Sequence, residues 1–315
     1  MLRYLARRLA LSAAQLAVLA VLVFLLTSLL PGDAATVAFN EQATPGEIAE
    51  ARHAMGLDEP LTARFAHWAG GLLTGDLGTS LVGHRPVSGI LTGSLGTTLA
   101  LALLTAVVLV PLATALGLLT GLREGSRTDR AVSAVTVALN AVPDFVLALF
   151  LVAVVSLRLG WLPSTWVGVD GGSWWGRPQL LVLPLTVLLA RTVCLLSRQI
   201  RAGTVDAVRA GYTVQARRLG VPRRSLVLRH VLPNALVPGA QELARTGDQL
   251  LGGVLIVEAV FAIPGSATAL VEAVRNRDVP TVQALTLLLA AVALLLNVAA
   301  DVACRRLAPR TEVLR

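Results

Sequence analysis

Long apolar stretches constrain the fold of this 315-residue chain more than any other feature of its sequence. Hydropathy shows five clear stretches, at residues 9–30, 97–122, 131–157, 179–196 and 281–304. Each is close to or above the roughly 20 residues that a helix needs to cross the hydrocarbon core of a bilayer. None alternates as barrel strands do, and lipid leaves unpaired backbone amides without partners, so we expect membrane-spanning helices.

A sixth span is predicted at residues 235–263, although Glu242, Arg245 and Asp248 lie within it. Each charge at the centre of a span costs about 2.5–3.5 kcal/mol on insertion scales. Arginines cluster before the first span, between the second and third, after the fourth and near the C-terminus. The positive-inside tendency places these clusters in the cytoplasm, which requires that 235–263 cross the bilayer. The sequence therefore predicts an all-α polytopic membrane protein with six transmembrane helices and both termini cytoplasmic.

Several kinds of chemistry are excluded by composition. All 27 basic residues are arginine, and without lysine the chain can form neither a Walker-type phosphate loop nor a Schiff base. Cys194 and Cys304 have no metal-site spacing, and His53, His67 and His84 are interpreted as surface residues, so we expect no metal or cofactor. Arginines that flank spans face anionic lipid, so the net charge of +8 does not indicate a nucleic-acid partner.

The segment at residues 198–233 lies between the fourth apolar stretch and the span predicted at 235–263. It carries eight arginines and one acid, Asp206. At its centre, Gly220 is the residue type that ends a helix in a left-handed conformation, and Pro222 suits the first turn of the next helix. The pattern predicts a helix, a tight turn and a short helix. On the cytoplasmic face of a membrane protein, such a hairpin is interpreted as a docking element.

The long loop at 31–96 is predicted to lie on the opposite side of the membrane. Residues 45–55 indicate a helix that begins at Thr44 and Pro45. Residues 61–73 indicate a second, amphipathic helix.

Three charges within the sixth span form a pattern of their own. Because Glu242, Arg245 and Asp248 are spaced three residues apart on a helix, Arg245 can reach both acids. Such a group should face the bundle interior or water and not lipid. Two interpretations stay open: the group lines a translocation path, or it is a structural ion network at an interface with a second subunit.

A second polar spot is expected in the third span. Asp144 follows Pro143, and Asn140 lies one turn earlier. The spot could serve a translocation path, or it could be a local hydrogen-bonded kink without contact to a solute. Arg191 is close enough to the end of the fourth apolar stretch to snorkel, and no special role is predicted for it.

Short motifs along nearly the whole chain resemble, in the same order, the permease subunits of dipeptide, oligopeptide and nickel ABC importers. They are 4–9, 30–33, 55–60, 75–80, 85–87 and 159–163, Tyr212 with Ala216, Arg217 and Gly220, then 234–238, 251–253, Glu258 with 260–261, 264–265 and 277–280. Each motif is weak alone, but their common order is specific. The chain departs from the pattern at Gly211, Gln215 and Ala308-Pro309-Arg310.

The resemblance implies a type I ABC importer transmembrane-domain fold. It comprises an N-terminal helix at 1–30, a helical extracytoplasmic loop region at 31–96, a five-helix core at 97–307 and a tail at 308–315. It implies a non-catalytic subunit that transports di- or oligopeptides or a related small solute. The implied partners are a second permease, two cytoplasmic ATPases that bind ATP and Mg, and an extracytoplasmic solute-binding protein.

The stretch 204–233 is similar to the coupling, or EAA-type, loop of these permeases, whose short helix sits in a groove of the ATPase. By this resemblance, small Ala216 and Gly220 allow close approach, while Leu226 adds apolar contact and Arg218 adds charge. The alternative is that the arginines only anchor the loop to lipid headgroups. The residues expected to dock the ATPase are Tyr212, Ala216, Arg217, Leu219, Gly220, Val221, Pro222, Arg223 and Arg224.

Two other classes of function are carried alongside the importer permease. One is an ion-coupled secondary transporter that uses Glu242, Arg245 and Asp248, although the two halves of the chain show no self-similarity. The other is a membrane scaffold or sensor that docks a soluble partner through 198–233. The sequence does not identify the solute.

Overall fold

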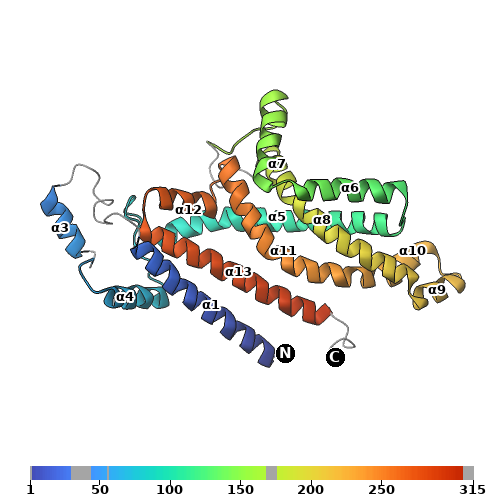
Figure 1. Cartoon of the computed structure of the whole chain (residues 1–315), viewed down its shortest axis with the longest axis horizontal. Coiled ribbons are helices and arrows are strands. Elements are labelled where there is room, and N and C mark those ends of the chain that lie inside the picture. The colour runs from blue at the N-terminus through green and yellow to red at the C-terminus, as the bar shows by residue number, and fades with distance from the viewer. Residues whose placement is uncertain (1, 30–43, 55–56, 168–175, 308–315) are drawn as a thin grey trace. The chain divides into compact units, whose positions relative to one another are not determined.

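The structure is a computed structural model that describes residues 2–29, 44–54, 57–167 and 176–307. The regular elements in these ranges are helices (Figure 1), as the sequence predicts. The chain divides into two compact units. Unit 1 contains residues 1–98 and 264–294, and unit 2 contains residues 99–263 and 295–315.

The number of spans depends on how bent helices are counted. Within the described ranges, four single helices are long and apolar enough to cross a membrane: Arg3–Ser28, Val87–Gly121, Gln179–Arg209 and Val279–Ala299. In two further cases, a pair of helices separated by a short break is long and apolar enough to cross a membrane only when the pair is taken together. The six predicted spans are reached if each pair is one span.

In unit 1, an aromatic cluster joins α1 (Leu2–Ser28) to α4 (Leu61–Thr74). The ring of Phe24 lies 5.2 Å from Phe65 and 5.4 Å from Trp68, measured between centroids. Edge-on and tilted pairs at this distance add stabilisation beyond the area that they bury. The amphipathic helix predicted at 61–73 is therefore confirmed, and its aromatic face packs on the first helix.

The other predicted loop helix is α3 (Pro45–Ala54). Thr44 and Glu47 form a capping box, in which the Thr44 amide donates to the Glu47 carboxylate at 2.8 Å and the Glu47 amide donates back to the Thr44 hydroxyl at 3.4 Å. The hydrogen bonds from the Thr44 amide and hydroxyl lower the pKa of the Glu47 carboxyl. A start at Thr44 and Pro45 is as predicted, and Met55 lies outside the described residues.

Unit 1 is completed by the first part of α5 (Val87–Gly121), α12 (Ser266–Arg275) and the first part of α13 (Val279–Leu307). Apolar side chains of α5 and α13 form a small core that includes Val87 and Leu285, both fully buried. The Gln283 amide also donates to the Thr27 hydroxyl at 2.7 Å, which ties α13 to α1.

Unit 2 is built around a long helix, α8 (Gln179–Arg209), which packs against α6 (Arg127–Ala141) and α11 (Leu232–Phe261). Helix α5 also approaches α8 closely. A Cβ atom on Gly121 would lie 2.6 Å from the Thr204 Cβ, so only glycine fits at this crossing. Helix α8 continues well beyond the predicted end at residue 196, because its last turns are amphipathic and hydropathy alone does not detect them.

The remaining helices of unit 2 are short. They are α7 (Asp144–Leu151), the π-helix η1 (Val152–Arg158), α9 (Gly211–Arg218), α10 (Arg223–Leu226) and the π-helix η3 (Val227–Val231).

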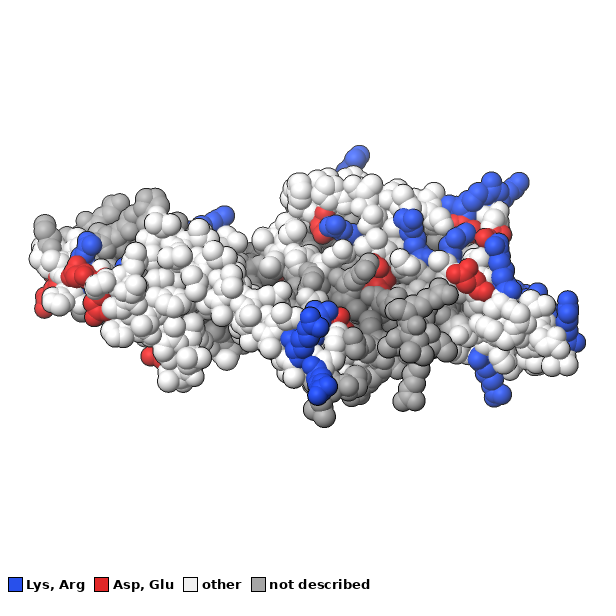
Figure 2. Space-filling view, turned by 60° about the horizontal axis from the view of Figure 1, so that its bottom comes forward, with Lys and Arg blue, Asp and Glu red and all other residues white. Residues whose placement is uncertain are grey.

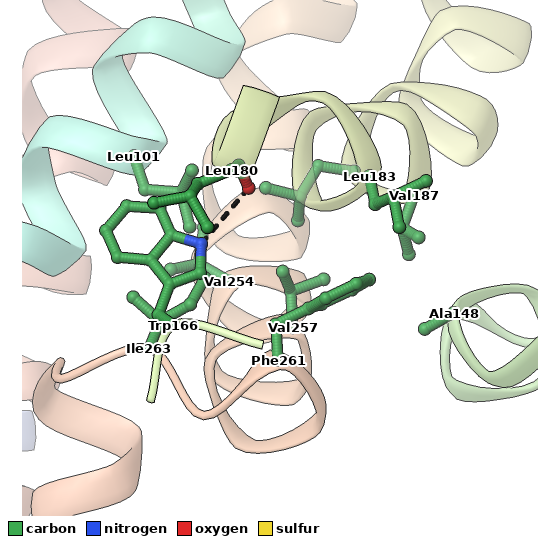
Figure 3. Close-up of a cluster of buried hydrophobic side chains, with 11 residues drawn as sticks. Leu101, Ala148, Trp166, Leu180, Leu183, Val187, Val254, Val257, Phe261 and Ile263 are labelled. Atoms are coloured by element: carbon green, nitrogen blue, oxygen red, sulfur yellow. Dashed lines mark hydrogen bonds between the residues drawn. The ribbon is translucent and has the colours of Figure 1, made fainter. Parts of the chain in front are cut away.

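A buried apolar cluster, here called the first cluster, contains Trp166 and faces of α8 and α11 (Figure 3). Pro184 lies inside α8 and has no N–H, so the Leu180 carbonyl loses its usual intrahelical donor. The indole of Trp166 donates to this carbonyl at 3.1 Å, and the Trp166 amide donates to the Phe261 carbonyl at 3.0 Å. Trp166, a loop residue, therefore supplies the donor that the Leu180 carbonyl lacks because of Pro184.

The third span, predicted at 131–157 with a kink at Pro143, is bent more sharply than a kink implies. Helix α6 ends at Ala141 and α7 begins at Asp144, and the two axes are bent by 101°. Val142 is extended because a residue before proline avoids the helical region, and Pro143 then precedes the new helix. The proline expected to kink the span breaks it.

Candidate functional site

The arginine-rich segment forms the predicted helical hairpin, with an additional break at Ala210 that makes its first helix, α9, short. Gly220 has φ +80°, its amide donates to the Arg217 carbonyl at 3.1 Å, and the Val221 amide donates to the Ala216 carbonyl at 3.2 Å. This pair of hydrogen bonds is the Schellman motif that ends a helix at a left-handed glycine. Pro222 has a ψ of 143° and stands directly before α10, one residue earlier than predicted.

Side chains of the hairpin divide into an exposed and a buried set. Leu219 is 74% exposed and Tyr212 48% exposed, which leaves apolar surface uncovered between arginines. Figure 2 shows basic side chains, with acidic ones among them, over the end of unit 2 that carries α9 and α10. Ala216 and Leu226 are buried in the chain's own core, and Val221 is half-buried. The other predicted docking residues are exposed: Arg217, Arg218, Gly220, Pro222, Arg223 and Arg224.

One apolar residue at this surface was not predicted. Leu228 on η3 is 60% exposed, two residues after the buried Leu226. Two residues are about half a helical turn, so Leu228 lies on the side opposite to the buried Leu226.

Two ion pairs join the C-terminal part of α8 to the first turn of α6 and to the α5–α6 turn before it. Arg201 binds Asp129 through both guanidinium nitrogens, with Nε to Oδ1 and Nη2 to Oδ2 each 2.7 Å. Arg209 Nη2 lies 2.6 Å from Glu124 Oε2. Bidentate arginine–carboxylate pairs are both strong and geometrically specific. The sequence shows no local signal for these pairs, because their members lie far apart in the chain.

The polar spot predicted at the third span has a partner that was not predicted. Asp144 is the first residue of α7, and its Oδ2 lies 3.8 Å from Nη1 of Arg191 on α8. Asn140 is half-buried on α6, and no hydrogen bond of its side chain is found among the described residues. Arg191, for which no role was predicted, is therefore part of a charged pair with Asp144.

The predicted triad on α11 is described only in part. The helix runs unbroken through its three positions, and Glu242 is half-buried. The Thr246 hydroxyl donates to the Glu242 carbonyl at 2.8 Å. The side chains of Arg245 and Asp248 lie outside the described residues, so their pairing stays a prediction.

A cavity of about 280 Å³ lies between α5, α8 and α11. Its lining is almost entirely apolar and includes Val110, Leu196, Ile200, Leu236 and Leu243. Such a lining offers no partners for a charged solute. Among the described residues no group of three or more His, Cys, Asp or Glu side chains could hold a metal ion, and Cys194 is a buried free thiol.

These observations define a helical membrane protein with an exposed basic hairpin, and comparisons identify its family. Residues 113–313 match the binding-protein-dependent transport system inner membrane component, and residues 1–102 match the N-terminal model of the same membrane components. The chain belongs to this family. It is thus a non-catalytic inner-membrane permease subunit of a binding-protein-dependent ABC importer, as the resemblance implied.

Individual relatives are similar over almost their whole length. The chain is 36% identical to the glutathione transport system permease protein GsiC of Salmonella choleraesuis, over 96% of both chains. It is 35% identical to the GsiC proteins of Escherichia coli strain K12 and Shigella flexneri, again over 96% of each. Membership of this family sets aside the secondary transporter and the scaffold.

Proposed function

We propose that this chain forms half of the pathway through which an ATP-driven importer moves short peptides, glutathione-like tripeptides among them, into the cell. The other half is a second permease, and the complex also contains two cytoplasmic ATPases that bind ATP and Mg and one extracytoplasmic binding protein. Both termini of the chain lie in the cytoplasm. The similarity to glutathione permeases over 96% of the chain supports the peptide class of cargo.

The observation that carries the proposal is the exposed hairpin of α9 and α10. A left-handed Gly220 fixes the angle between the two helices, and Leu219 and Tyr212 expose apolar surface among arginines. An exposed hairpin with apolar side chains at its surface suits insertion into a groove of a partner protein. We assign it as the docking site for the ATPase.

The hairpin is continuous with the helices that it would have to move. One residue, Ala210, separates α8 from α9, while α10 leads through η3 directly into α11. Helices α8 and α11 also pack against each other. A displacement of the hairpin by a closing ATPase would therefore move both helices as one body, which a floppy loop could not do.

Charged residues of unit 2 are proposed to serve the pathway or its walls. Asn140 and Asp144 flank the break at Pro143, and the Asp144 carboxylate lies beside Arg191 of α8. Glu242, Arg245 and Asp248 lie on α11, either along the pathway or at the contact with the second permease. Charge reversal at Arg245 that leaves both assembly and transport unchanged would remove either role.

Cysteine cross-linking of the assembled complex tests the docking site. Leu219→Cys and Tyr212→Cys are each expected to form an adduct with a cysteine placed in the ATPase groove, and Leu219→Glu should reduce co-purification of the ATPase. Leu73→Glu is the matched control, since Leu73 is 90% exposed on α4 and belongs to unit 1, not to the hairpin. Equal recovery of the ATPase with Leu219→Glu and Leu73→Glu would refute the assignment.

A separate experiment tests the cargo. Proteoliposomes with the complete complex and its binding protein are offered radiolabelled glutathione or dialanine. We expect ATP-dependent accumulation of at least one of them. Accumulation of neither, together with a working ATPase, would exclude short peptides as the cargo class.

A further inference from the structure

Two charged pairs join the α6–α7 region to one helix, α8, and they differ in closeness. Asp129 and Arg201 are in contact through two hydrogen bonds of 2.7 Å. Asp144 and Arg191, ten positions earlier on α8, are 3.8 Å apart and form no hydrogen bond with each other. Aspartate and arginine therefore form two different pairs along α8. The hydrogen-bonded Asp129 and Arg201 are here called the closed pair, and the more distant Asp144 and Arg191 the loose pair.

The loose pair leaves the arginine available. The Arg191 side chain is 49% exposed, whereas the Asp144 side chain is only 12% exposed. A guanidinium carries five N–H donors, and no hydrogen bond of the Arg191 side chain is found in the described part of the chain. The carboxylate thus neutralises part of the charge, while about half of the Arg191 side chain stays exposed.

The surroundings of the pair are apolar on both sides along α8. Leu188 belongs to the first cluster, and Val193 belongs to a second cluster that continues down the helix. On α11 the two clusters are likewise separated at Gly253, between Leu250 and Val254. The charged pair lies at the level of unit 2 where the first and second clusters meet.

Gly253 keeps space beside the carboxylate. A Cβ atom at this position would lie 3.8 Å from Asp144 Oδ2 and 3.2 Å from Leu188 Cδ2. Any larger side chain would press on Leu188 and cover the acid. Helices α7, α8 and α11 therefore meet where Gly253 lies beside the Asp144 carboxylate of the loose pair.

A charge within a membrane span is costly, and such groups mark pathways for charged solutes more often than architecture. If this pair served only to hold α7 against α8, closed geometry would be favoured, as it is for Asp129 and Arg201. Arginine is also the side chain best suited to binding a carboxylate through two parallel hydrogen bonds. Peptides carry at least one carboxylate, at the C-terminus.

We propose that Arg191 is a cargo-binding residue that exchanges the carboxylate of Asp144 for a carboxylate of the passing peptide. Asp144 neutralises the guanidinium when no cargo is present and competes with the cargo so that it is released. The inference rests on the proposed function, because it requires cargo that carries a carboxylate.

The experiment measures uptake and ATP hydrolysis by the complete reconstituted complex, with glutathione as the probe and dialanine as the second probe. The variants are Arg191→Gln, Asp144→Asn, the double variant, and the exchange Asp144→Arg with Arg191→Asp. Arg191→Gln should lower uptake per ATP hydrolysed about tenfold, the loss expected when a charge-assisted hydrogen bond is removed. Neither the double variant nor the exchange should restore uptake.

The closed pair supplies the matched control. Exchange of its members, Asp129→Arg with Arg201→Asp, tests a purely structural ion pair, and it should recover much of the thermal stability that Arg201→Gln loses. Recovery of uptake by the Asp144 and Arg191 exchange would overturn the proposal, because only a structural pair is indifferent to which helix carries which charge. So would unchanged uptake per ATP in Arg191→Gln.

A failure of the proposed peptide cargo and a failure of the role of Arg191 give different results. If the wild-type complex accumulates neither probe, the proposed peptide cargo is wrong and the inference fails with it. If the wild-type complex accumulates a probe and the exchange restores uptake, the permease function stands and only the role of Arg191 is wrong.

Discussion

The carboxylate of Asp278 accepts a hydrogen bond from the hydroxyl of Ser80, a residue 198 positions earlier in the chain. The same carboxylate accepts from the Leu81 amide at 3.1 Å and from the Thr281 hydroxyl at 2.6 Å. Ser80 ends the motif at 75–80 and Asp278 belongs to the motif at 277–280, so two of the motifs that suggested the family meet in unit 1. Asp278 fixes the loop before α5 to the start of α13.

Asp278→Ala is expected to lower the stability of the complex by about 2–4 kcal/mol, because it leaves several buried donors without an acceptor. Thermal unfolding of the purified complex measures the loss. Asp58→Ala is the control, since Asp58 pairs with Arg52 at an exposed site where ion pairs contribute little. Equal melting temperatures for the two variants would contradict the importance of this contact.

Trp166→Phe should destabilise the complex by about 1–3 kcal/mol, since the Leu180 carbonyl loses its donor in a buried place. Pro184→Ala gives α8 an N–H for that carbonyl, so the same Trp166→Phe change should cost less in the Pro184→Ala background. A double-mutant cycle of melting temperatures measures this coupling. Additive effects would show that the indole does not substitute for the missing amide.

Gly117→Ala should destabilise the packing of α5 on α8 by about 1–3 kcal/mol, because the new Cβ would lie 2.7 Å from the Ile200 Cβ. Gly96→Ala is a matched change in the same helix, where a Cβ meets nothing within 4 Å. It should be neutral or raise stability by up to about 1 kcal/mol through helix propensity. Equal melting temperatures for the two variants would contradict the close approach of α5 and α8.

Gly220→Val should reduce ATP-driven uptake more strongly than it reduces stability. No atom lies within 4 Å of a Cβ at Gly220, so the effect comes from the left-handed φ of +80°, which costs a branched side chain about 1–2 kcal/mol. Gly125→Val imposes similar strain, at φ +74°, in the turn between α5 and α6. Uptake and ATP hydrolysis should uncouple only in Gly220→Val, and equal uncoupling in both would argue against docking at the hairpin.

Local signals in the sequence were sufficient for much of the fold. Glycine and proline at 220 and 222 predicted the turn of the hairpin, because backbone conformations of these residues are restricted whatever surrounds them. Thr44 and Pro45 predicted the start of α3 in the same way. The break at Pro143 was underestimated, since a proline signals a defect in a helix but not the angle that packing then selects.

The candidate site was less accessible to sequence reasoning. Arg191 was interpreted as a snorkelling residue, because its distance from the end of the apolar stretch was known and its neighbour on α7 was not. Its proximity to Asp144 depends on how two helices pack, and no pattern along either helix encodes that register. The closed pair of Asp129 and Arg201 was missed for the same reason.

The central claim is that this chain is a permease whose energy comes from ATPases bound at its hairpin. Uptake of a labelled peptide by proteoliposomes with the complete complex tests it most directly, with ATP inside or outside and with ionophores that collapse ion gradients. We predict accumulation that requires ATP on the hairpin side and persists without any gradient. Accumulation driven by a gradient in vesicles that contain the permeases without the ATPases would contradict the claim.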